Sequence, residues 1–244
     1  MRKAWAWAGL WAAVAVVAMA GQVRAAEPFE GKVRLETVAP AAGDKPMAME
    51  YSVKKDVIRV DTKVAGMENY ALMYPTEKKM VSVMPAQKMY MEMPLGGAQA
   101  AAPEDAKKPE ITKTDKTEKI AFKADGTSLK RVKAGEEGGK SYDAEQWTVK
   151  TDQGTTELWF AKGLAPLVSL AETFKAMPKS PTATWAGADK LPGYPYKIVT
   201  KDADGKLTSE TIVNEIDTKP LDDALFKVPA EYKKFEMPKM PAKE

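Results

Sequence analysis

The sequence predicts a mainly β domain of the α+β class, with an antiparallel sheet and one or a few helices. Short segments alternate apolar with polar residues and are separated by turn residues at nearly regular spacing, as in an antiparallel sheet with one face in water. A single later segment changes to the period of an α-helix. The chain has no cysteine, so an apolar core must stabilise the fold without disulfides.

The N-terminus has the three parts of a secretory signal peptide. Arg2 and Lys3 make the first three residues positively charged. Residues 4–20 form an apolar run, and Ala25 provides a small residue for cleavage. We expect cleavage between Ala20 and Ala25, most favourably after Ala25, and export to the periplasm. The apolar run is shorter than the roughly 20 residues that span a bilayer core, so no transmembrane anchor is expected after cleavage.

Residues 26–244 are expected to form one domain that begins with a series of short strands. The first six expected strands are Phe29–Val38, Met49–Val53, Val57–Asp61, Tyr70–Tyr74, Lys79–Met84 and Lys88–Met93. The segment Gly96–Glu110 is rich in alanine, proline and charge without a period, which predicts a flexible loop within the domain.

The second half adds further strands and the helix. Its expected strands are Lys119–Phe122, Ser128–Lys133, Tyr142–Thr151, Thr155–Phe160, Tyr194–Asp202 and Lys206–Asp217. The helix is expected over Leu164–Met177, where Pro166 suits the first turn and Pro178 ends it. Residues 220–226 predict a short helical turn, and the end of the tail that begins at Lys233 is expected to be frayed.

Composition excludes several classes of function. Removing Arg2, Lys3 and Arg24 with the signal peptide leaves 34 basic residues against 34 acidic ones, so no nucleic-acid partner is expected. The chain has no histidine, which rules out Ser-His-Asp and Cys-His catalysis and histidine-ligated zinc or haem within it. We therefore expect a protein that is not an enzyme and has no cofactor.

Three stretches resemble a known bacterial family. The segments "NYALMYPTEKKMVSVMPAQKMYMEMP", "YDAEQWTVKTDQGTTELWFAKGL" and "GYPYKIVTKDADGKLTSETIVNEIDTKPLDDALFKVPAEYKKFEMP" are similar to the exported domain-of-unknown-function family 4412. That family is similar in architecture to the periplasmic lipoprotein carriers LolA and LolB. The resemblance implies a curved antiparallel half-barrel with one or a few helices on its concave side, and a hydrophobic ligand or lipidated protein as partner. No functional residue of LolA can be matched to this chain.

Methionine is the unusual component, with 14 in the chain. Met89, Met91 and Met93 alternate along one expected strand and so share a face, and Met80 and Met84 lie on the preceding strand. We interpret these flexible side chains as the lining of a core or an adaptable apolar cavity. The alternative is a Cu(I) site of soft thioethers, which is disfavoured because the usual histidine and cysteine ligands are missing.

Aromatic and helical residues complete the candidate hydrophobic cavity. Trp147 shares a face with Val149 on one expected strand. On the next expected strand, Leu158 and Phe160 flank Trp159, so that strand is apolar on both faces. One face then meets a core and the other meets a helix or a ligand, and ordinary burial under the helix is the favoured interpretation. Trp185 is either a lid or an interface residue. The candidate ligand-binding residues, with no catalytic or metal residues among them, are Met80, Met84, Met89, Met91, Met93, Trp147, Leu158, Phe160, Leu167 and Phe174. The leading hypothesis is a periplasmic carrier or sensor of a lipid or acyl chain. The two alternatives are a methionine-rich periplasmic protein that binds Cu(I), and an envelope structural or interaction protein without a ligand.

Overall fold

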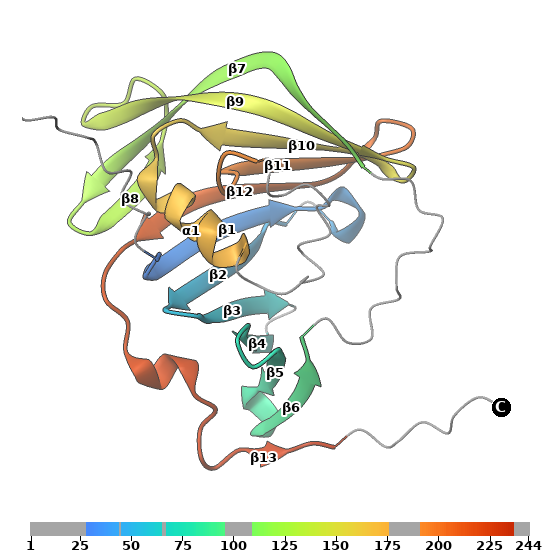
Figure 1. The fold of residues 1–244 in the computed structure, drawn as a ribbon, viewed down its shortest axis with the longest axis vertical. Helices are drawn as coiled ribbons and strands as arrows, with labels where there is room; N and C mark the ends of the chain where they lie inside the picture. The colour runs from blue at the N-terminus through green and yellow to red at the C-terminus, as the bar shows by residue number, and fades with distance from the viewer. Residues whose placement is uncertain (1–27, 44, 65–66, 96–108, 176–190, 237–244) are drawn as a thin grey trace, which may run out of the picture.

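A computed structural model describes residues 28–43, 45–64, 67–95, 109–175 and 191–236. Within these residues the chain forms one sheet of 13 strands and one α-helix (Figure 1). The predicted signal peptide, most of the predicted loop over residues 96–110, Met177 and Trp185 lie outside the described residues.

Six strands of the second half close into an antiparallel barrel, at the top of Figure 1. The barrel strands are β7 (Glu110–Asp125), β8 (Ser128–Val132), β9 (Gly139–Thr151), β10 (Gly154–Ala161), β11 (Lys197–Asp202) and β12 (Leu207–Asp217). They pair in the order β11-β10-β9-β7-β8-β12, and the pairing of β12 with β11 closes the ring. Closure leaves this half of the sheet without free edges.

The first half of the chain extends the sheet from β12 as an open antiparallel array. Its strands are β1 (Gly31–Val38), β2 (Met47–Lys54), β3 (Val57–Val64), β4 (Met67–Tyr74), β5 (Lys79–Met84) and β6 (Met89–Pro94), in that order. The two-residue strand β13 (Lys233–Lys234) pairs in parallel with β6 and covers the outer edge. Short 3-10 turns lie at Pro40–Ala42, Pro85–Gln87 and Asp223–Phe226.

Strand β12 belongs to both parts, and a β-bulge adapts it to this role. Glu215 pairs with Arg34 while Val213 pairs with Leu35, so Asn214 has no partner in β1. The Asn214 side chain instead donates to Glu36 of β1 and accepts from Arg131 of β8. The extra residue thereby joins the barrel and the open sheet at one point.

Helix α1 (Ala165–Lys175) packs on the face of the open sheet that we call the inner face, which carries Val33, Tyr51 and Ile58. Leu164, just before the helix, and Leu167 and Leu170 in it are almost completely buried and belong to one core cluster with strands β1–β3. This cluster continues through Val213 and Ile216 into the barrel, where it includes Phe122 and Trp159. The apolar stripe predicted for the helix therefore packs in the main core.

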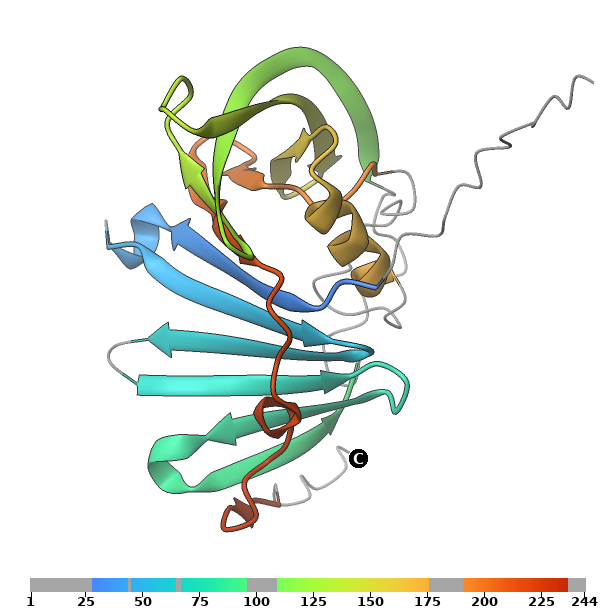
Figure 2. The same cartoon turned by 90° about the vertical axis from the view of Figure 1, so that its left-hand side faces the viewer.

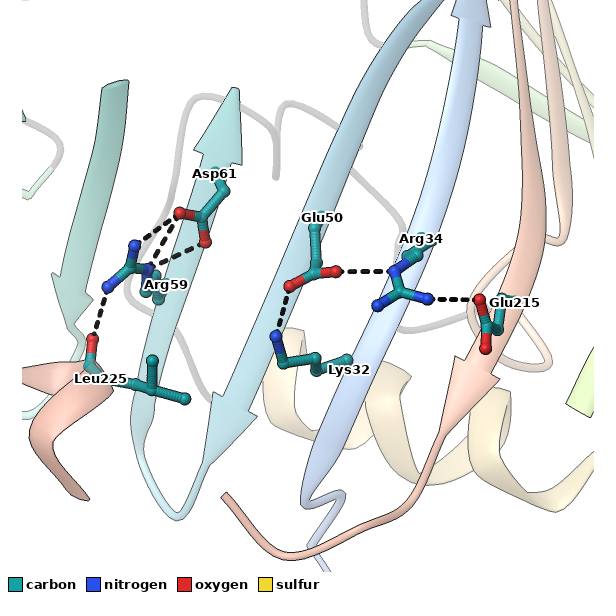
Figure 3. A network of polar contacts seen from close by, with 7 residues as sticks. All are labelled: Lys32, Arg34, Glu50, Arg59, Asp61, Glu215 and Leu225. Atoms are coloured by element: carbon teal, nitrogen blue, oxygen red, sulfur yellow. Dashed lines mark hydrogen bonds and ion pairs between the residues drawn. The ribbon is translucent and has the colours of Figure 1, made fainter. Parts of the chain in front are cut away.

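The opposite, outer face of β1–β3 is charged, and its groups are paired (Figure 3). Glu50 accepts from Lys32 at 2.6 Å and from Arg34 at 2.7 Å, and Arg34 also pairs with Glu215 at 2.5 Å. Burial alone would raise the pKa of Glu50, but the hydrogen bonds from Lys32 and Arg34 outweigh it and lower the pKa. The network links β2, β1 and β12 side by side.

The C-terminal segment 218–235, hereafter the strap, crosses the outer face of the open sheet (Figure 2). Lys54 donates to the carbonyl of Leu221, Arg59 to that of Leu225 at 3.0 Å and Tyr74 to that of Phe226 at 2.9 Å. At the end of the strap, the Lys233 N–H donates to the carbonyl of Lys88, just before β6, and the Phe235 N–H donates to that of Tyr90 in β6. Val228 and Tyr232 of the strap pack on a second core cluster, formed by Tyr70, Leu72, Val81 and Val83.

The structure corrects two expectations. The half-barrel is wrong, because β7–β12 close into a complete barrel through the long-range β11–β12 pairing. The strand expected at Lys119–Phe122 is part of the 16-residue β7, whose first residue Glu110 was assigned to the flexible loop. The start of β7 is polar, and its pairing with β9 supplies an order that the residue pattern does not indicate. The end of the tail, residues 237–244, lies outside the described residues.

No helix among the described residues is long and apolar enough to cross a membrane.

We predict that Arg59→Ala loosens the strap. The Arg59 guanidinium donates to Leu225, pairs with Asp61 at 2.6 Å and lies 3.8 Å from the centre of the Tyr70 ring. Its loss should lower the free energy of unfolding in urea by about 2 kcal/mol and speed tryptic cleavage after Lys227. The control is Lys63→Ala, on the same strand as Arg59, which removes an exposed ion pair with Glu68 of β4. Equal effects of the two substitutions would contradict this role for Arg59.

Candidate functional site

The inner face of β4–β6 carries six methionines in adjoining positions. Met80 of β5 pairs directly with Met93 of β6 and with Met73 of β4, forming one row across three strands. Met84 pairs with Met89 in a second row, and Met91 lies between the rows opposite Ser82. We call this surface the methionine face; its members are Met73, Met80, Met84, Met89, Met91 and Met93.

The methionine face continues the buried core without a break. The row of Met73, Met80 and Met93 extends through Ile58 of β3 to Val53 of β2, and both of these are fully buried. The six methionines themselves are all only partly buried. Burial therefore fades along the sheet, from the strands that helix α1 covers toward the β5–β6 edge.

The other face of the same strands is built from different residues. Tyr70 and Leu72 of β4 and Val81 and Val83 of β5 are buried beneath the strap. Successive residues of a strand point to opposite faces, so these side chains and the methionines belong to separate surfaces. The strap covers the face of Leu, Val and Tyr, while the methionines on the opposite face remain partly exposed.

Three aromatic rings join the end of helix α1 to the inner face of β2. The ring of Phe174 lies 5.7 Å from that of Tyr51 and 5.4 Å from that of Tyr194. Tyr51 and Tyr194 are hydrogen-bonded to each other, and burial raises the pKa of both hydroxyls. Through Val60 and Ala71, Tyr51 occupies the same row as Ser82 and Met91. These two tyrosines fix the end of the helix on the inner face of β2, and β3 lies between this cluster and the methionine face.

The remaining candidates lie elsewhere on the barrel. Leu158 and Phe160 are buried in a third cluster with Val149 and Leu191, and Trp147 packs against it. Trp159 belongs to the main core instead. The structure thus brings together the five predicted methionines, places Leu167 and Phe174 on the side of helix α1 that packs in the main core, and puts the other three candidates in a separate cluster on the barrel wall.

A small cavity separates the third cluster from the helix. It has a volume of about 190 Å³ and is lined by residues that include Phe160, Leu167 and Tyr194. Typical ligand pockets have about 300–1,000 Å³, so this cavity alone is too small for a lipid chain.

Glu145 lines this cavity and is nearly buried. Its carboxylate lies 2.8 Å from the Lys113 ammonium and 3.0 Å from that of Lys162, and the Trp147 indole donates to it at 3.3 Å. The hydrogen bond from Lys113 is the largest effect, and with those from Lys162 and Trp147 it lowers the pKa of Glu145 to about 2. Glu145 therefore stays ionised at neutral pH.

Sequence reasoning missed residues that join the candidate site only through strand pairing. Met73 lies next to Met80 only because β4 pairs with β5. Tyr51 and Tyr194 are distant in sequence and meet at Phe174. The alternation of apolar positions could place each on an inner face, but no local signal identifies its neighbour across strands.

Comparisons with known proteins identify one family. The model of the family described as "Domain of unknown function (DUF4412)" matches residues 29–122 and 122–232, which confirms the resemblance expected from the sequence. No curated protein matches the chain.

The solved structures that the comparison finds have low sequence identity with this chain. An uncharacterized conserved protein from Thermus thermophilus has 12% identity and a TM-score of 0.46, over 84% of this chain and 90% of that chain. A structure of PNGF-II has 13% identity and a TM-score of 0.39, over 83% of this chain and 30% of that chain. A LolA superfamily protein from Nitrosomonas europaea has 14% identity and a TM-score of 0.37, over 83% and 90%. We transfer no activity from these proteins.

We predict an acid-dependent effect of Glu145→Gln on stability. Because the pKa of Glu145 in the folded protein, about 2, is below the roughly 4.3 of an unfolded chain, ionisation of Glu145 stabilises the fold above about pH 4.5. This contribution is lost as the pH falls toward 2. The substitution should cost about 1 kcal/mol in urea unfolding at pH 7 and progressively less below pH 4.5. Glu110→Gln, at an exposed position of β7, is the control, and a cost that does not vary with pH would contradict the assignment.

Proposed function

The chain belongs to the DUF4412 family, and for this member we propose the function of a non-enzymatic, exported protein that binds an apolar ligand on its methionine face. The ligand class that we propose is a lipid or the acyl chain of a lipidated protein. The observation that carries this proposal is the continuous surface of six partly exposed methionines beside the buried core.

The residue chemistry of the face suits an acyl chain. Burying one methylene contributes about 0.8 kcal/mol, so a dozen methylenes would contribute roughly 10 kcal/mol before the cost of association. Methionine has three rotatable bonds and a polarisable sulfur, which lets such a surface adapt to chains of different length. By register, the inner face of β4–β6 carries only neutral side chains between the methionines, including Asn69, Ala71 and Ser82. Such a surface favours an uncharged, flexible ligand.

A catalytic role is not part of the proposal. The chain has neither histidine nor cysteine to act as base or nucleophile. Glu145, nearly buried beside a cavity, has a pKa of about 2 and is thus a poor proton donor or acceptor at neutral pH. The ion pairs with Lys113 and Lys162 stabilise the ionised carboxylate of Glu145, which gives it a structural role.

We propose the periplasm as the site of action. Residues 1–25 have the pattern of a cleavable signal peptide, and the remaining chain has balanced charge. An apolar face left partly exposed is consistent with a protein that takes its ligand from a membrane or from another carrier. Nucleic acid is not a proposed partner, because balanced charge offers no attraction to phosphates.

The experiment is binding of a fluorescent fatty-acid probe to the protein purified from the periplasm. Met91→Glu places a charge at the centre of the face and should weaken binding at least tenfold, which corresponds to about 1.4 kcal/mol. Because Met91 is only partly buried, the fold should survive the change.

Ala86→Glu is the matched control, since it adds the same charge at the exposed turn that joins β5 and β6. It should leave probe binding within a factor of two of the wild type. Absence of probe binding by the wild-type protein would refute the proposal and favour an envelope protein without a ligand.

A further inference from the structure

The methionine face is distinguished by its sulfur atoms as well as by its apolar character. On the outer face, β4 and β5 use Leu72, Val81 and Val83, which are ordinary apolar residues of a buried sheet. Valine is enriched in strands, whereas methionine is not among the favoured residues. Besides an adaptable apolar surface, the six methionines bring to this face soft sulfur atoms that valine and leucine lack.

Strand pairing concentrates five of these thioethers on one hairpin. Met80 and Met93 are directly opposed, Met84 and Met89 are directly opposed, and Met91 lies between the two pairs. Directly opposed side chains have Cβ atoms about 4.5–5.5 Å apart, and diagonal neighbours are about 7–8 Å apart. Since each methionine side chain has three rotatable bonds, the sulfurs of one pair and of Met91 can reach a common point.

We propose that the β5–β6 hairpin binds one Cu(I) ion through methionine thioethers. Soft sulfur ligands select Cu(I) among the available metals. The hairpin's inner face carries Ser82 as its only other residue between the methionines, so no lysine or arginine on it repels a cation. The lack of histidine and cysteine disfavoured this site on sequence grounds. The strand register brings several methionines together, and their thioethers take the place of those ligands.

The thioether ligands give the site a distinctive pH dependence. Histidine and cysteine must lose a proton to bind a metal, so their sites weaken as the pH falls. A thioether has no proton to lose, and the inner face of this hairpin carries no titratable side chain. Affinity for Cu(I) should therefore be the same, within a factor of about three, at pH 6 and pH 8.

The test is an anaerobic titration of the periplasmic protein with Cu(I) in competition with a chromophoric Cu(I) chelator. The wild-type protein should withhold one equivalent of Cu(I) from the chelator. The triple substitution Met89→Leu, Met91→Leu and Met93→Leu should lower the affinity at least 100-fold. Leucine keeps the apolar character and nearly the volume of each side chain, so folding should persist.

Two further variants keep the outcome unambiguous. Met47→Leu is the control, because Met47 is an exposed methionine on β2, away from the hairpin, and its loss should leave Cu(I) affinity unchanged. If the triple variant does not fold, Met91→Leu alone should lower the affinity at least tenfold. A wild-type protein that withholds no Cu(I), or leucine variants that bind it equally well, would overturn the site.

The metal site goes beyond the proposed apolar ligand and can fail separately from it. The leucine variants retain the apolar surface, so fatty-acid probe binding should stay within a factor of three of the wild type while Cu(I) binding is lost. Loss of Cu(I) binding with retained probe binding supports the metal site. Retained Cu(I) binding in the triple variant contradicts it, whatever the probe shows.

Discussion

Neighbouring residues of a strand point to opposite faces, so the open half of the sheet has two faces of different composition. The strap covers the outer one. Leu72, Val81 and Val83 obtain their cover from the strap through Val228 and Tyr232, and hydrogen bonds from Arg59 and Tyr74 hold the strap in place. With the outer face covered in this way, the β6 edge is also paired by β13. The inner face of the same strands is then the surface left for an apolar or soft ligand.

The closed barrel and the open sheet share strand β12. Strand β12 pairs with β1, β8 and β11, and the Lys32–Glu50–Arg34–Glu215 network links β12 to β1 and β2 on the outer face. Helix α1 fills the inner side of this junction with Leu164, Leu167 and Leu170. The result is a gradient from a filled core to a partly exposed methionine face, in which the inner surface is packed at one end and accessible at the other.

Local pattern was enough to place most strands and the helix, because alternation and helical period are properties of single segments. The six strands β1–β6 and the helical face of Leu167 and Leu170 were predicted within a few residues. Barrel closure was not, since the β11–β12 ring and the bulge at Asn214 join segments whose pairing leaves no mark on either alone. Met89, Met91 and Met93 were predicted to share a face, because alternation is visible within one strand. That Met73 and Met93 lie opposite Met80, and Met89 opposite Met84, is visible only in the strand register.

If the methionine face binds an apolar ligand in the compartment where the protein acts, that ligand should be present in the purified protein. Mass spectrometry of organic extracts detects it, using protein purified from the periplasm without detergent and compared with a mock purification. We expect a lipid or fatty acid that co-purifies in a fixed ratio to the protein. Extracts indistinguishable from the mock purification would contradict it.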